Sequence, residues 1–267
     1  MGNDFLVAEW DEISELGVDE SQLGKLAERM CDRHFGVGAD GLEVVYSADT
    51  NDADARIRIF NSDASEAEIS GNGTRCVAAY LIAERQFPSP IRIATAAGVK
   101  ALTLLNQSGG RFDFEMAMGA PRYGDDGVGC DLELADETRK VTILDVGNPQ
   151  CALLVDDFEF DWRTMGAEIE RHPRFPNRTN VSFIRILDDR TIDVRFWERG
   201  AGETMSSGTG STGAAAAAVL SGRVKSPVTV CTPAGDMKLS WPDGGAISLE
   251  GPAQLICRGE YLAPDAL

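Results

Sequence analysis

The stretch Glu198–Leu220, with the sequence ERGAGETMSSGTGSTGAAAAAVL, decides the fold of this chain. Its second half is rich in alanine and contains no proline, which predicts a buried helix, whereas the glycines and serines before it predict a tight loop. The junction at Ser207–Gly210 would present free backbone N–H groups and the positive end of a helix dipole, a combination that binds anions. Taken alone, the junction is better explained as a simple helix cap.

A similar stretch occurs in the first half of the chain, at residues 61–83, with the sequence NSDASEAEISGNGTRCVAAYLIA. Ser70 and the Gly-Asn-Gly after it lead into an apolar helix, as Ser207 and Gly-Thr-Gly do in the second half. The two stretches suggest an internal duplication that gives each half a central helix. The N-termini of these helices would face each other across a cleft and hold one anionic group, with Ser70 and Ser207 flanking it.

Charge and composition restrict the classes of partner. The net charge of −18 argues against a nucleic acid and against an anionic membrane surface as partners. No stretch approaches the roughly 20 apolar residues of a membrane span, and the start MGNDFLVAEW lacks the features of a secretory signal. The 6 cysteines show no CxxC spacing, and a zinc site is not expected with only His34 and His172 as imidazole ligands. We therefore expect a cytoplasmic protein with reduced thiols and no metal.

Short predicted strands greatly outnumber predicted helices, which favours an α+β fold with mostly antiparallel sheets over alternating βαβ units. We expect a strand at Phe5–Trp10, a helix capped by Ser21, and late strands near 246–250 and 254–258. We place an N-terminal domain at residues 1–118 and a C-terminal domain at residues 119–267, with the last few residues returning to the first domain.

Seven motifs of the chain resemble those of the diaminopimelate epimerase family and occur in the family's order. They are GNDF at 2–5, FGVGADG at 35–41, FNSDASEAE at 60–68, SGNGTRC at 70–76, GNPQ at 147–150, FPNRTNV at 175–181 and ERGAGET at 198–204. The resemblance implies two pseudo-symmetric domains, each a mostly antiparallel sheet wrapped around a central helix. It also implies a homodimer without cofactor that converts LL- into meso-diaminopimelate for lysine and peptidoglycan biosynthesis.

The same resemblance implies a two-base mechanism, with one base on each face of the substrate's α-carbon. The family places cysteines where this chain has Ser70 and Ser207, and a histidine where it has Gln150, whereas the family's glutamate is present as Glu198. A hydroxyl group is far less acidic than a thiol and needs an adjacent base. We therefore assign the catalytic positions to these four residues and expect weak activity.

Substrate-binding positions are better retained. The family's motifs place them at Asn3, Asn61, Gly71, Asn72, Asn148, Asn180, Glu198, Arg199, Gly208 and Thr209. The amides and charged groups would bind the carboxylates and ammonium groups of a small amino acid, with the backbone at Gly71 and Gly208 supplying donors to the reacting carboxylate. Two alternatives remain: a related amino-acid isomerase, racemase or dehydratase with altered chemistry, or a non-catalytic homologue that binds an amino acid.

Overall fold

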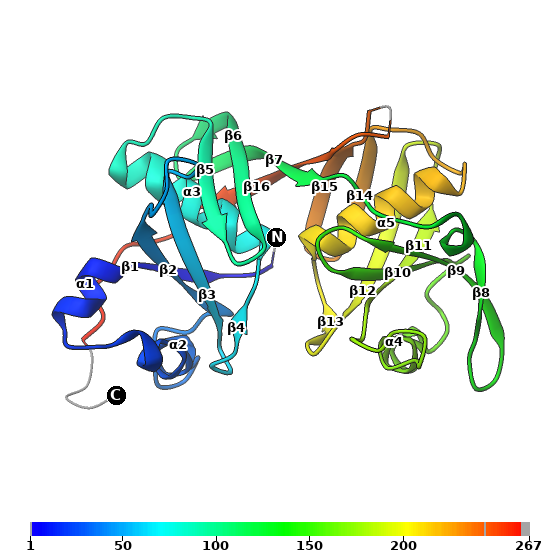
Figure 1. Ribbon diagram of the computed structural model, residues 1–267, viewed down its shortest axis with the longest axis horizontal. Helices are drawn as coiled ribbons and strands as arrows, with labels where there is room; N and C mark the ends of the chain where they lie inside the picture. The colour runs from blue at the N-terminus through cyan, green and yellow to red at the C-terminus, as the bar shows by residue number, and fades with distance from the viewer. Residues whose placement is uncertain (1, 243, 263–267) are drawn as a thin grey trace. The chain divides into compact units, whose positions relative to one another are not determined.

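The computed structural model describes residues 2–242 and 244–262 and divides the chain into two compact units (Figure 1). The N-terminal unit comprises Asn3–Met116 and the chain from Pro252 onward, and the C-terminal unit comprises Ala117–Gly251 together with Gly2. Two strands, β7 and β16, each contain a point where the chain passes from one unit to the other.

The N-terminal unit is an α+β structure whose strands pair in the order β1-β2-β3-β5-β6-β7, with β4 also paired to β3. Its elements are β1 (Phe5–Glu9), α1 (Trp10–Glu15), a 3-10 turn (Glu20–Gln22), α2 (Leu23–Cys31), β2 (Gly41–Ser47), β3 (Ala55–Asn61), β4 (Glu66–Ala67), α3 (Gly71–Arg85), β5 (Ile91–Thr95), β6 (Gly98–Ser108) and β7 (Arg111–Gly119).

The C-terminal unit has strands in the order β16-β15-β14-β12-β11-β10-β9-β8, with β13 also paired to β12. Its elements are a 3-10 turn (Asp125–Gly127), β8 (Cys130–Glu133), β9 (Thr138–Asp145), β10 (Pro149–Leu154), α4 (Trp162–Glu170), β11 (Asn180–Ile186), β12 (Thr191–Glu198), β13 (Gly202–Thr204), α5 (Gly208–Leu220), β14 (Val228–Thr232), β15 (Gly235–Ser240) and β16 (Ile247–Gln254).

The strand pairings of the two units repeat one pattern. In the N-terminal unit β1 pairs parallel to β2, β2 antiparallel to β3, β3 parallel to β5 and β5 antiparallel to β6. In the C-terminal unit β10, β11, β12, β14 and β15 follow with the same alternation of parallel and antiparallel pairs. The short strands β4 and β13 occupy equivalent places beside β3 and β12. The predicted pseudo-symmetric α+β fold is therefore confirmed.

Each unit has a buried helix that follows its short strand. The helix α5 contacts β9, β10, β11, β12, β14 and β15, and its residues from Gly208 to Ala218 are all buried. Alanine makes this possible because a methyl side chain lets the sheet approach the helix backbone closely. The equivalent helix α3 contacts β1, β2 and β5, and in Figure 1 both helices lie against the strands of their own units.

A second helix covers the other face of each sheet. Leu23, Leu26 and Met30 of α2 form a buried cluster with Leu42 and Val44 of β2. In the C-terminal unit, Trp162 and Ile169 of α4 form the equivalent cluster with Val181 and Phe183 of β11. Since side chains alternate between the two faces of a strand, the residues between these positions on β2 and β11 point toward α3 and α5.

Three local predictions were wrong. The helix before β2 is not capped by Ser21, because Asp19 accepts the backbone N–H of Ser21 and begins a 3-10 turn with a capping box. Trp10 begins α1 instead of ending the first strand. The separate strand expected at 254–258 is absent from the described structure, because β16 runs unbroken to Gln254 and the chain after it is irregular.

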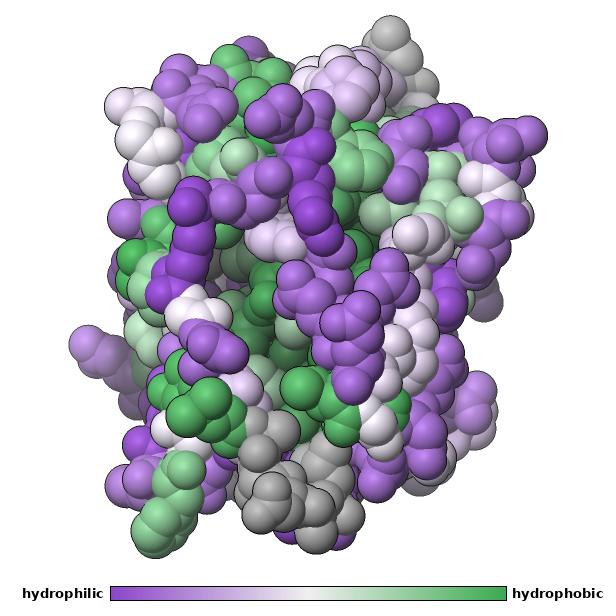
Figure 2. Space-filling model, turned by 90° about the vertical axis from the view of Figure 1, so that its left-hand side faces the viewer, coloured by the Kyte–Doolittle hydropathy of each residue, from purple (hydrophilic) through white to green (hydrophobic). Residues whose placement is uncertain are grey.

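The surface agrees with the composition. Figure 2 shows one face of the molecule on which hydrophilic residues predominate, as the net charge of −18 leads one to expect. No helix among the described residues has both the length and the apolar character needed to cross a membrane. All six cysteines are free thiols; Cys31 and Cys151 are buried, and Cys257 is exposed.

Candidate active site

Ser207 begins α5 and makes two hydrogen bonds in which its hydroxyl group has opposite roles. As the N-cap of the helix it accepts the backbone N–H of Gly210 at 3.1 Å, which satisfies one of the unpaired donors of the first turn. Its own hydroxyl donates to Oε2 of Glu198 at 2.8 Å. The serine therefore already has a carboxylate positioned to accept its proton, the arrangement that activates an alcohol.

Glu198 lies at the end of β12 and is held by two hydroxyl groups. Thr204 on the paired strand β13 donates to Oε1 at 2.7 Å, and Ser207 donates to Oε2. Burial raises the pKa of the Glu198 carboxyl above its ordinary value, and the two hydroxyl donors oppose that rise. A raised pKa makes a carboxyl better suited to exchanging protons near neutral pH.

Gln150 and Asn148 form a chain of amides next to the first turn of α5. Gln150 is buried and donates from Nε2 to Oδ1 of Asn148 at 2.7 Å. Asn148 donates in turn from Nδ2 to Oγ1 of Thr209 at 3.2 Å. The buried Oε1 of Gln150 has no hydrogen-bond partner in the structure. This chain fixes the amide groups at the N-terminus of the helix, but Gln150 has no group that titrates.

Asn180 and Arg199 belong to the same network in the C-terminal unit. Asn180 donates to the carbonyl of Pro149 at 3.0 Å and accepts the backbone N–H of Arg199 at 3.0 Å. The guanidinium group of Arg199 is exposed and donates to the carbonyl of Asn177. Within residues 2–242 and 244–262, no carboxylate forms an ion pair with Arg199, so its charge is available to a ligand.

Ser70 has the same position at the start of α3 as Ser207 has at the start of α5. Its hydroxyl oxygen accepts the backbone N–H of Gly73 at 3.1 Å. Asn72 of the first turn donates to Oδ1 of Asn3 at 2.6 Å, just as Asn148 bonds Thr209 in the other unit. Asn61, at the end of β3, donates to the hydroxyl of Ser65 at 2.9 Å. Ser70, Asn72 and Asn3 therefore lie at the N-terminus of α3, which begins at Gly71, and Ser207, Thr209, Asn148 and Gln150 lie at that of α5, which begins at Gly208. The hydrogen bonds of Asn61, Asn180 and Arg199 given above connect them to neighbouring loop and strand residues.

Two buried charged residues near α3 were not predicted from the sequence. Arg75 is fully buried and donates to Oδ1 of Asn72 at 2.5 Å, and to the carbonyls of Gly71 and Pro252. It thereby fixes the amide of Asn72. Glu43 lies within β2, is 0% exposed, and has no hydrogen-bond partner on either carboxyl oxygen in the described part of the chain. The only signal for Glu43 in the sequence is a single carboxylate within the apolar strand GLEVVYS.

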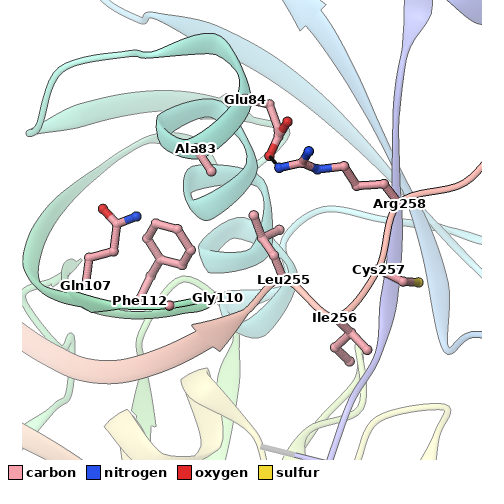
Figure 3. Close-up of a pocket in the computed structure, with 10 residues that line it drawn as sticks. Ala83, Glu84, Gln107, Gly110, Phe112, Leu255, Ile256, Cys257 and Arg258 are labelled. Carbon is pink, nitrogen blue, oxygen red and sulfur yellow. Dashed lines mark hydrogen bonds and ion pairs between the residues drawn. The ribbon is translucent and has the colours of Figure 1, made fainter.

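A separate surface pocket lies in the N-terminal unit, away from these residues. It is bordered by Glu84, Phe112, Leu255 and Arg258, and Figure 3 shows Arg258 paired with Glu84 beside α3. None of the residues predicted for the active site lines it. We assign it no role in the chemistry.

Several known proteins that are similar in sequence to this chain over nearly its whole length share one family description. The family model described as diaminopimelate epimerase matches residues 1–124 and 142–256. A diaminopimelate epimerase from Pelotomaculum thermopropionicum is 41% identical over 98% of this chain and 96% of its own length. The chain belongs to the diaminopimelate epimerase family.

Solved structures of low sequence identity share the fold of this family member. A phenazine biosynthesis protein of the PhzF family from Bacillus anthracis aligns with a TM-score of 0.64 at 17% identity, over 96% of this chain and 94% of its own. A hydroxyproline epimerase from Agrobacterium vitis aligns with a TM-score of 0.64 at 16% identity, over 92% of this chain and 82% of its own. At such low identity these likenesses establish the architecture alone.

Proposed function

We propose that this chain is a diaminopimelate epimerase that interconverts the LL and meso forms by proton transfer through its own side chains. The single observation that supports this most is the hydrogen bond of Ser207 to Glu198, because it supplies the base that an alcohol needs in place of a thiol. The product would serve lysine and peptidoglycan biosynthesis in the cytoplasm, as membership of the family implies. The two-base mechanism that the family resemblance implies would assign one face of the α-carbon to Ser70 and the other to Ser207.

The proposed step breaks the bond between the α-carbon and its hydrogen. The proton passes to Oγ of Ser207 as the hydroxyl proton of that serine passes to Glu198, and the electron pair stays on the α-carbon and spreads into the adjacent carboxylate. Reprotonation from the opposite face then inverts the centre. Donors at the N-termini of α3 and α5, including the fixed amides of Asn72 and Asn148, would stabilise the charge on the carboxylate.

Glu198→Gln tests the role of the carboxylate. The amide retains the shape of the side chain but accepts no proton, so we expect α-proton exchange of LL-diaminopimelate in D2O to fall by about 10²-fold or more. Incorporation of deuterium is followed by NMR, which reports the elementary step even when net turnover is slow. Glu203→Gln is the matched control, because Glu203 lies on β13 in an exposed ion pair with Arg163. Equal losses in the two variants would contradict the assignment.

A second candidate function rests on the raised pKa of Glu198. If Glu198 were the principal base, the protein would catalyse a reaction with one base, such as an isomerisation or an elimination on another amino acid. Brisk exchange that disappears in Glu198→Gln but persists when Ser70 and Ser207 are both changed to alanine would favour this candidate. Absence of exchange, with binding of the amino acid retained, would favour a non-catalytic homologue.

We further propose that the protein forms a homodimer, as the family resemblance implies. Size-exclusion chromatography with light scattering should then give twice the chain mass of 28.7 kDa. A mass equal to that of one chain at micromolar concentration would contradict the proposal.

A further inference from the structure

Glu43 is a buried carboxyl group for which the fold supplies no partner. Its side chain is 0% exposed, and neither Oε1 nor Oε2 has a hydrogen-bond partner among the residues that the structure describes. Leaving such a group unpaired is costly, so unpaired buried carboxyls are rare outside functional sites. A purely structural role would be served better by an apolar residue such as Val44 or Val45 of the same strand.

The register of the sheet shows where this carboxyl points. Leu42 and Val44 face α2, so Glu43 between them faces α3. Its registered neighbours are Val7 on β1 and Ile59 on β3, both apolar, and they lie on the same face of the sheet. The carboxyl therefore projects from an apolar surface toward the helix that begins after Ser70.

Gly73 lies next to both the Glu43 carboxyl and Ser70. A Cβ atom placed on Gly73 would lie 1.6 Å from Oε1 of Glu43 and 3.3 Å from Cβ of Ser70. Any larger residue at this position would displace the Glu43 carboxyl. Ser70 accepts the N–H of this same glycine, and the structure gives no acceptor for the hydroxyl proton of Ser70 within residues 2–242 and 244–262.

The internal repeat shows that this arrangement belongs to one unit alone. Ser182 of β11 is the residue equivalent to Glu43 of β2. Glu43 pairs with Ile59 on β3, and Ser182 pairs with Phe196 at the equivalent place on β12. The hydroxyl of Ser182 donates to the carbonyl of Gly210, the glycine that corresponds to Gly73. The position equivalent to Glu43 thus holds an uncharged residue in the C-terminal unit.

The carboxylate of the C-terminal unit is likewise missing from its equivalent place in the N-terminal unit. Trp197 of β12 pairs with Glu203 on β13, and Phe60 of β3 pairs with Glu66 on β4 in the same way, so Trp197 and Phe60 are equivalent. The residues that follow them, Glu198 and Asn61, are therefore also equivalent. Asn61 cannot accept a proton from Ser70. Among the described residues, each unit therefore has a carboxyl near the first turn of its central helix, Glu198 on β12 and Glu43 on β2.

We propose that Glu43 is the proton-accepting partner of Ser70, in the role that Glu198 has for Ser207. This proposal rests on the proposed function. As the bond between the α-carbon and its hydrogen breaks on the Ser70 face, the proton passes to Oγ of Ser70 and the hydroxyl proton of Ser70 passes to the Glu43 carboxylate. The electron pair stays on the substrate, and the transfers reverse when that face is reprotonated. Glu43 is thus a positioning and relay residue that acts through Ser70.

The surroundings of Glu43 raise its pKa toward the neutral pH at which a proton relay would operate. Burial raises the pKa of Glu43 to about 8. The neighbours on β1 and β3 carry no charge. The titratable group that faces Glu43 from α3 is Cys76, and its pKa is raised to about 11 by burial and by the nearby Glu43. Proton transfer through Ser70 should therefore increase as the pH rises toward 8, where Glu43 becomes a carboxylate.

The first arm of the test requires no catalytic activity. Protein labelled with ¹³C-glutamate is titrated by NMR, and the Glu43 carboxyl signal is identified by its loss in Glu43→Gln. If Ser70 donates to the ionised Glu43 in solution, Ser70→Gly should raise the titration midpoint of Glu43 by roughly 0.5 units, since that donor is removed. Ser207→Gly is the matched control and should leave the midpoint unchanged. Glycine is well tolerated at an N-cap, so both variants should fold. An unchanged midpoint in Ser70→Gly would overturn the proposal.

The second arm measures α-proton exchange of diaminopimelate in D2O between pH 6 and pH 9. We expect Glu43→Gln to lower the rate about 10²-fold and to abolish its rise toward pH 8. Glu43→Asp should keep the rise with a lower plateau, and Cys76→Ser should match the parent. A parent-like rate and pH profile in Glu43→Gln would overturn the proposal. If no form exchanges, the proposed function fails, and the titration alone then decides whether Glu43 serves Ser70.

Discussion

Replacing Ser70 and Ser207 together by cysteine is expected to raise the rate of α-proton exchange of diaminopimelate by orders of magnitude. A thiol has a pKa of about 8.5, so part of it is ionised near neutral pH, whereas a serine hydroxyl is ionised only through its carboxylate partner. Both serines already occupy the N-caps of α3 and α5, where the helix dipole favours a thiolate. The rate is measured as deuterium incorporation by NMR, with the parent protein expected to exchange weakly.

The single changes should have little effect on epimerisation, because inversion requires a working group on each face and paired catalytic groups act as a unit. Ser206→Cys provides the control, since it adds a buried thiol one residue before Ser207. A rise in that variant as large as in the double one would show that thiols at other positions also promote exchange. No exchange in a folded double variant would indicate a different substrate or a binding protein.

Glu43→Gln is expected to remove a large pH dependence from the free energy of unfolding. The pKa of Glu43 is about 8 in the folded chain and near 4.5 when it is unfolded. Below pH 4.5 the carboxyl is protonated in both the folded and the unfolded chain, so folding buries no charge at Glu43. Between these values the unfolded state loses the proton first, and stability falls as the pH rises. At about 1.4 kcal/mol per pKa unit, the loss between pH 5 and pH 9 should be roughly 4 kcal/mol.

The measurement is urea unfolding of the parent and of Glu43→Gln at each pH, with the difference between the two proteins plotted against pH. Taking the difference cancels the titration of the other carboxyl groups. Glu28→Gln, which changes an exposed residue of α2, controls for the loss of one charge. A difference that is the same at pH 5 and pH 9 would show that the Glu43 carboxyl is hydrated or paired in solution.

The central helices could be predicted from the sequence because their signals are local. A serine followed by glycines and a run of alanine specifies an N-cap and a helix without reference to the rest of the chain. The repeat of that signal then indicated two similar units, and the N-cap positions of Ser70 and Ser207 agree with it. The cap at Asp19 was missed because Ser21 two residues later gives the same local signal.

Features that depend on pairing between distant segments could not be predicted. Whether Glu43 is exposed or buried is decided by its registered neighbours Val7 and Ile59 and by the helix above it. Arg75 gave no signal either, because one of its acceptors is the carbonyl of Pro252, far away in the sequence. The bond from Ser207 to Glu198 likewise depends on the turn that brings β13 back along β12.

The return of the chain to the N-terminal unit at Pro252 has a consequence for biosynthesis. Residues 117–251, which form most of the C-terminal unit, separate the two segments of the N-terminal unit in the sequence. The N-terminal unit is made first but cannot be completed until Pro252 emerges, because the buried guanidinium of Arg75 has its third acceptor there. The half of the chain that is translated first therefore lacks one acceptor of its buried arginine until residues 117–251 have been synthesised.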